Sequence, residues 1–152
     1  MIQADDRPKL NSAAVEVFGT MYHTPIELLQ EVPDKSEWQL DSAYVKTSIQ
    51  YSGPQEAHLE FYFPCALAKS IAEGFLGIDP SDLTEAQVID TMREAANMIG
   101  GNFLGRLDPD GACTLGIPDA ALTEDFVPDQ KSQGRGTLTF VSDFGHLWLF
   151  VS

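Results

Sequence analysis

Residues 90–101 read DTMREAANMIGG, a stretch that predicts a helix with one polar face. At about 100° per residue, Asp90, Glu94, Asn97 and Gly101 fall on one stripe of that helix. The opposite side is apolar and carries Val88, Ile89, Met92, Ala96, Ile99 and Phe103. A helix that is apolar on one side only is typical of a domain in which helices cover a core. We therefore expect the carboxylates and the carboxamide to project together, away from that core.

A pair of glycines, Gly100 and Gly101, follows the polar residues in the same helix. Each glycine destabilises a helix by about 1 kcal/mol relative to alanine, so two in succession suggest another purpose. Without a Cβ they leave bare backbone that another surface can approach closely. We expect that surface to belong to a partner or to a second helix of this domain, with Met98 as a contact at its rim.

The chain has 152 residues, which suits a single domain over residues 1–152 with a core of its own. Its hydrophobic share of 43% is typical of a globular protein. The formal net charge is −14, from 23 acidic and 9 basic residues. Nucleic acids and anionic membrane surfaces bind clustered lysines and arginines, so the charge argues against both as partners.

Neither the cysteines nor the histidines predict a metal site. Cys65 and Cys113 have no metal-ligand spacing, and the three histidines lie far apart in the sequence. The N-terminal stretch does not resemble a secretion signal, and no apolar run is long enough to span a bilayer. We therefore expect a cytoplasmic protein with reduced cysteines and with no metal or cofactor of its own.

The remaining patterns predict an α+β domain. Helices are expected at residues 9–22, from Pro64 to Gly77, and through the motif to near Leu107, with Asp82 and Glu85 as a capping box. Strands are expected at residues 26–32, 43–51, 55–63, 112–117, 136–142 and 145–151, with a long acidic loop over residues 119–133. This order predicts an antiparallel sheet of about six strands with helices packed on one face.

The last of these strands is apolar on both faces. Leu147, Leu149 and Val151 alternate with Trp148 and Phe150. Such a strand must be covered on both sides, by helices or by another subunit. A bare hydrophobic edge strand pairs readily with another chain, and a two-fold homodimer is the simplest closed arrangement. We therefore expect a homodimer.

The motif resembles that of the CheC/CheX family of chemotaxis phosphatases. The shared pattern is Asp90, three residues, Glu94, two residues, Asn97, and then Met-Ile-Gly-Gly. A proline, Pro118, follows Asn97 after twenty intervening residues, a slightly shorter spacing than the family's. The order of elements is also similar over essentially the whole chain. CheC carries two copies of the motif and this chain has one, so the resemblance is closest to CheX and implies a CheX-like fold.

The resemblance implies a phosphatase that hydrolyses the phospho-aspartate of a CheY-type response-regulator receiver. Asn97 would hold the attacking water, because a carboxamide can both accept a hydrogen bond and donate one. Glu94 would form an ion pair with a lysine of the receiver. The binding surface would also contain Asp90, Met98, Gly100 and Gly101. The receiver would supply Mg²⁺, so this chain needs no metal of its own.

Other functions fit the same residues. The main alternative is a non-catalytic adaptor or flagellar-switch-type module that docks a receiver without hydrolysing it. Docking alone would need only Glu94, so the presence of Asn97 favours the enzyme. Asp90 has an alternative role in an ion pair with Arg93 on the same helix. A small-ligand-binding domain is a third possibility and would require a polar-lined cavity.

Overall fold

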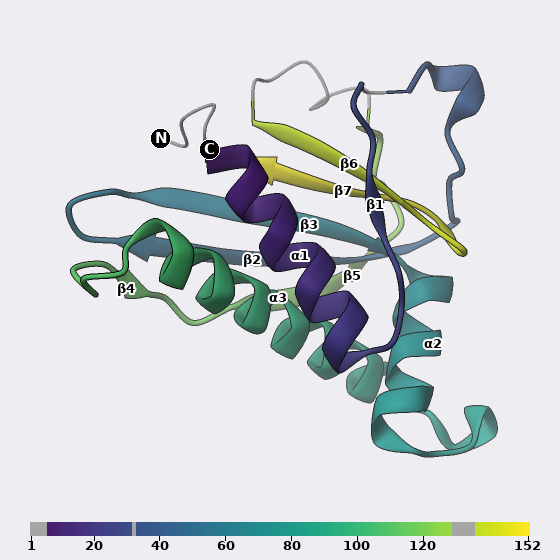
Figure 1. Cartoon of the computed structure of the whole chain (residues 1–152). Helices are drawn as coiled ribbons and strands as arrows, with labels where there is room; N and C mark the ends of the chain where they lie inside the picture. The colour runs from purple at the N-terminus through teal and green to yellow at the C-terminus, as the bar shows by residue number, and fades with distance from the viewer. Residues whose placement is uncertain (1–5, 32, 129–135) are drawn as a thin grey trace.

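The computed structural model describes residues 6–31, 33–128 and 136–152 (Figure 1). The helices are α1 (Arg7–Met21), α2 (Cys65–Leu76) and α3 (Glu85–Leu107), with 3-10 turns at Lys35–Glu37 and Pro80–Asp82. The strands are β1 (Glu27–Leu28), β2 (Tyr44–Ser52), β3 (Ala57–Pro64), β4 (Thr114–Leu115), β5 (Asp119–Thr123), β6 (Thr137–Ser142) and β7 (Gly145–Val151). Within these residues the strands form one antiparallel sheet, and the helices cover one of its faces (Figure 1). The predicted α+β class is confirmed.

The core lies between the helices and this face of the sheet. Alternate residues of the central strands point into it, among them Ile49, Leu59 and Leu149, each at most 2% exposed. The apolar side of α3 meets them with Met92 and Ile99, both fully buried. The predicted division of α3 into a buried face and an exposed face is therefore present in the structure.

The start of α3 differs from the prediction. Its capping box is formed by Thr84 and Gln87 rather than by Asp82 and Glu85. Thr84 Oγ1 accepts a hydrogen bond from the backbone N–H of Gln87 at 3.2 Å, and the backbone N–H of Thr84 donates to Gln87 Oε1 at 2.9 Å. Asp82 instead ends the preceding 3-10 turn. A threonine with glutamine three residues later caps a helix as well as the predicted pair would.

The strand order places β7 in the interior of the sheet. The order is β1-β6-β7-β3-β2-β4, so β7 is hydrogen-bonded on both sides. On the face away from the helices, Trp148 is fully buried beside Tyr44 and Tyr62, and Trp38 and Phe126 from connecting segments pack over them. The expectation that this strand is a bare edge is wrong. Both of its apolar faces are covered within one chain.

The segment that was predicted to be an acidic loop contains a strand. Residues 119–123 form β5, which pairs with Tyr44–Ser48 of β2, and residues 129–133 of the predicted loop lie outside the described residues. β4 pairs further along the same side of β2 and is shorter than the predicted strand. The predicted strand at residues 26–32 shortens to β1, and its residue 32 is not described. Main-chain pairing to an available sheet edge creates β5 although most of its side chains are exposed, because backbone groups form such bonds whatever the side chains.

His146 makes the stability of the fold depend on pH. It is buried in β7, and its Nδ1 accepts a hydrogen bond from the backbone N–H of Gln39 at 3.0 Å. Burial lowers the pKa of His146 from its ordinary value of 6.5. Below pH 6.5 the imidazole of His146 takes up a proton in the unfolded chain but stays neutral in the folded chain until the pH reaches its lower folded-state pKa. Stability therefore falls as the pH drops from 6.5 through the folded-state pKa.

We expect the His146→Gln variant to lose less stability than the parent between pH 7.5 and pH 5.5. Glutamine does not titrate and keeps an acceptor for the Gln39 N–H. Denaturant unfolding at the two pH values measures the difference. His23→Gln, a change of an exposed histidine, is the matched control and should behave like the parent. An identical pH response in His146→Gln and the parent would contradict this assignment.

Candidate functional site

The polar motif lies on the face of α3 that points away from the sheet. Asp90, Glu94 and Gly101 are exposed, and Asn97 is half-buried among them. Asn97 is the third residue after Glu94 in a regular helix, so their Cβ atoms are about 5–6 Å apart. The structure therefore brings together the carboxylate and the carboxamide that the sequence singled out.

The Asn97 side chain is available for binding. In the part of the chain that the structure describes, its carboxamide takes part in no hydrogen bond with another residue. Its oxygen can accept a hydrogen bond from water, and its nitrogen can donate two. An amide that is held on a helix and bonded to nothing else can orient a water molecule.

Glu94 lies on the side of the motif that faces α1. Tyr22 lies at the end of α1. Burial, and to a smaller extent the negative charge of Glu94, raises the pKa of Tyr22 to about 12. The Tyr22 hydroxyl donates to Met98 Sδ at 3.8 Å. Met98 is half-buried and packs against the core, so it helps to join α1 to α3. The thioether is a weak acceptor, and this contact is mainly one of packing.

Two further polar contacts involve exposed residues of α3. Asp90 forms an ion pair with Arg93, as its spacing suggested. Arg106 forms an ion pair with Glu16 of α1, which also accepts a hydrogen bond from Asn102 at 3.4 Å. Exposed pairs of this kind typically contribute about 0–1 kcal/mol. The Arg106–Glu16 pair joins α3 to α1, whereas the Asp90–Arg93 pair lies within α3.

The two glycines have different surroundings. Gly100 is buried, and a Cβ there would lie 3.3 Å from Leu115 Cδ1 and 3.5 Å from Ile49 Cδ1. Its role is to let α3 approach β2 and β4, so the expectation of exposed backbone or of a second helix is wrong for Gly100. Gly101 is exposed, and its Cβ would meet only Leu115, at 4.0 Å. A partner can therefore approach Gly101.

The connection between β4 and β5 runs along α3 (Figure 1). Leu115 packs on Gly100 and Gly101, and Leu122 lines a cavity together with Ile89. Residues 116–118 therefore pass the turns of α3 that carry Glu94 and Asn97. Pro118 is half-buried there.

The sequence did not single out Ile117, which ends the predicted strand at residues 112–117. In the structure it follows β4, and its side chain is 92% exposed. The only signal for it was its position between Gly116 and Pro118, two residues that restrict a backbone.

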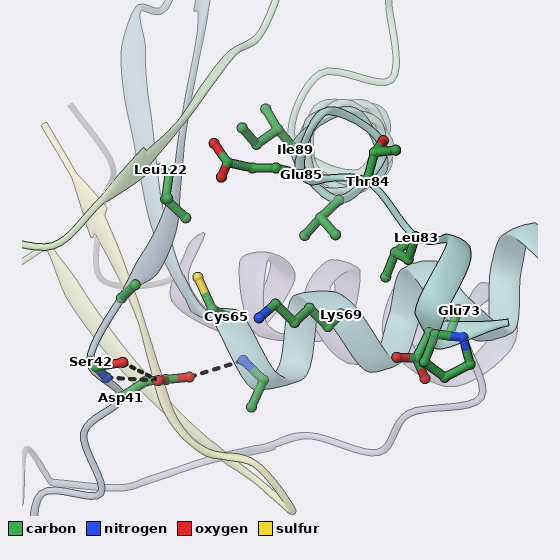
Figure 2. A pocket seen from close by; sticks show the side chains of 14 residues that line it. Asp41, Ser42, Cys65, Lys69, Glu73, Leu83, Thr84, Glu85, Ile89 and Leu122 are labelled. Atoms are coloured by element: carbon green, nitrogen blue, oxygen red, sulfur yellow. Dashed lines mark hydrogen bonds between the residues drawn. The ribbon is translucent and has the colours of Figure 1, made fainter. Parts of the chain in front are cut away.

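A cavity of about 660 Å³ lies beside the start of α3, between α2, α3 and β5 (Figure 2). It is lined by Cys65 and Lys69 of α2, by Glu85 and Ile89 of α3 and by Leu122, among others. Burial raises the pKa of the Cys65 thiol, so this cysteine is a poor nucleophile at neutral pH. Asp90, Glu94 and Asn97 do not line this cavity.

The described ranges contain no group of three or more histidine, cysteine, aspartate or glutamate side chains that could hold a metal ion. None of their helices is both long enough and apolar enough to cross a membrane.

Comparisons with known proteins agree with the fold. The sequence model of the chemotaxis phosphatase CheX matches residues 45–140, which include the motif. The comparison with curated proteins gives no match.

Three solved structures illustrate the shared fold. CheX from Vibrio vulnificus is 21% identical with a TM-score of 0.76, and the match covers 97% of this chain and 98% of that one. CheX from Desulfovibrio desulfuricans is 16% identical with a TM-score of 0.74 over the same shares. A CheX–CheY–BeF₃–Mg²⁺ complex from Borrelia burgdorferi contains a chain that is 19% identical, with a TM-score of 0.68 over 99% of this chain and 98% of that one.

Proposed function

Because the chain belongs to the CheX family of chemotaxis phosphatases, we propose that it hydrolyses the phospho-aspartate of a CheY-type response-regulator receiver. The observation that carries this proposal is the pair formed by Glu94 and Asn97 on the outer face of α3, with the Asn97 amide unbonded within the described residues. The solved CheX–CheY complex from Borrelia burgdorferi supports a CheY-type partner for a protein of this fold.

In the proposed reaction, Asn97 positions water. The water oxygen attacks phosphorus in line with the bond to the aspartate oxygen, and that bond breaks. The products are inorganic phosphate and the free carboxylate of the receiver. Asn97 accepts a hydrogen bond from the water and thereby fixes its direction, without taking its proton as a base would. No covalent intermediate forms on this chain.

In the same proposal, Glu94 acts in docking. A carboxylate gains nothing from contact with an anionic phosphoryl group, so we propose that its partner is a cation, a lysine of the receiver. The ion pair sets the register of α3 on the receiver. Mg²⁺ is held by the receiver and neutralises charge on the phosphoryl oxygens.

The competing function is docking without hydrolysis. A phosphate-release assay with phosphorylated receivers from the same genome separates the two. We expect this protein to accelerate phosphate release well above each receiver's own rate for at least one of them. Binding without acceleration would support the adaptor and would contradict the enzyme.

Since response regulators act in the cytoplasm, we place the protein there as well.

We also propose a two-fold homodimer, because the chain resembles CheX, which pairs through its sheet. The argument from a bare edge strand no longer supports this proposal. Sedimentation velocity at micromolar concentration should give twice the monomer mass of 16.7 kDa. A single species of 16.7 kDa over that concentration range would contradict the dimer and would leave the phosphatase proposal unaffected.

A further inference from the structure

The exposure of Ile117 is unusual within the described part of the chain. Its side chain is 92% exposed, and the next most exposed large hydrophobic side chain is that of Leu40, at 54%. Single hydrophobic residues on a surface are common and need no explanation by themselves. Two further observations, on the backbone around Ile117 and on its position, are what give it significance.

The backbone around Ile117 is held on both sides. The N–H of Gly116 donates to the carbonyl of Gln50 at 2.7 Å, and a Cβ on Gly116 would lie 3.0 Å from that oxygen. Pro118 has a fixed φ angle, and the next residue, Asp119, already pairs with β2. The backbone of such a short, anchored connection loses little conformational freedom when the connection binds a partner.

The position of Ile117 is beside the motif. The connection passes α3 between the contact of Leu115 with Gly100 and the cavity shared by Leu122 and Ile89. Ile117 therefore lies on the β5 side of α3, on the connection that passes the turns carrying Glu94 and Asn97, whereas Tyr22 of α1 contacts Met98.

We propose that Ile117 is the apolar anchor that holds the receiver against α3. This inference rests on the proposed function and deepens it by naming a residue that sets affinity for the receiver. A typical interface buries about 800 Å² on each partner, so a receiver whose phosphoryl group reaches Asn97 must also cover the neighbouring β4–β5 connection. Ile117 has no polar side-chain atom, so it affects the binding of the receiver and not the chemical step.

The test compares Ile117→Ser with Leu40→Ser, a matched change of an exposed apolar residue. Leu40 follows Gln39, which is bonded to His146 at the β6–β7 turn, and thus lies away from the motif. Binding to a beryllofluoride-activated receiver and steady-state phosphate release are both measured. We expect Ile117→Ser to raise Kd and KM about tenfold, which corresponds to about 1.4 kcal/mol, with kcat little changed. Leu40→Ser should match the parent, and Ile117→Leu should retain most of the affinity.

The outcomes separate this inference from the proposed function. Parental Kd and KM in Ile117→Ser would overturn the anchor, and so would a loss confined to kcat. A parent protein that binds the receiver without releasing phosphate would contradict the enzyme, and the anchor would still be decided by the Kd values. A parent that binds no activated receiver would overturn both. Unfolding midpoints close to that of the parent show that the variants are folded, as expected for such an exposed side chain.

Discussion

Replacement of Asn97 by alanine is expected to lower the rate of receiver dephosphorylation by about 100-fold or more while leaving receiver binding nearly unchanged. Misplacement of a reacting group by about 1 Å costs on the order of 100-fold in rate, and the alanine variant has no group to hold the water at all. Phosphate release at saturating receiver concentration measures the rate, and titration with beryllofluoride-activated receiver measures binding.

The matched control for this substitution is Asn102→Ala. Asn102 lies on the same helix, but its side chain bonds to Glu16 and Arg106 rather than facing the motif. It should leave the rate within about twofold, since its contacts are those of an exposed polar network. Near-parental turnover in Asn97→Ala would remove Asn97 from the mechanism. Asn97→Asp, which keeps the size but adds a negative charge near the phosphoryl group, should also lose most of the activity.

Replacement of Glu94 by alanine is expected to weaken the complex with the receiver by about 2–5 kcal/mol, the cost of leaving the receiver's lysine unpaired in a buried interface. In the free protein Glu94 is exposed on the outer face of α3, so its removal leaves no buried charge without a partner. The effect should therefore appear in Kd rather than in the free energy of unfolding.

Glu85→Ala is the control for Glu94. Glu85 is an exposed glutamate on the same helix, nine residues earlier and about 13 Å away along the axis. Its removal should leave Kd unchanged. Equal Kd values for Glu94→Ala and the parent would exclude the proposed docking role. Asn97→Ala and Glu94→Ala together should separate the rate of hydrolysis from affinity.

The sequence alone was sufficient for the features that depend on local spacing. The apolar side of α3, with Met92 and Ile99, follows from a period of 3.6 residues, and the alternation in β2 and β3 follows from a period of two. The exposed stripe of Asp90, Glu94 and Asn97 follows from the same helical period. Each of these patterns shows which side of a helix or strand is buried, and each can be recognised within about twenty consecutive residues.

Only the tertiary structure decided which elements became neighbours. β7 is apolar on both faces, which predicts that both are buried. Its place between β6 and β3, however, comes from pairing with residues far away in the chain, such as Phe61 opposite Leu149. The burial of Gly100 against Leu115 and the exposure of Ile117 depend in the same way on where β4 and β5 settle along β2. Main-chain hydrogen bonds between remote strands join these neighbours, and since every residue except proline offers the same backbone groups, the local sequence of one strand does not identify its distant partner.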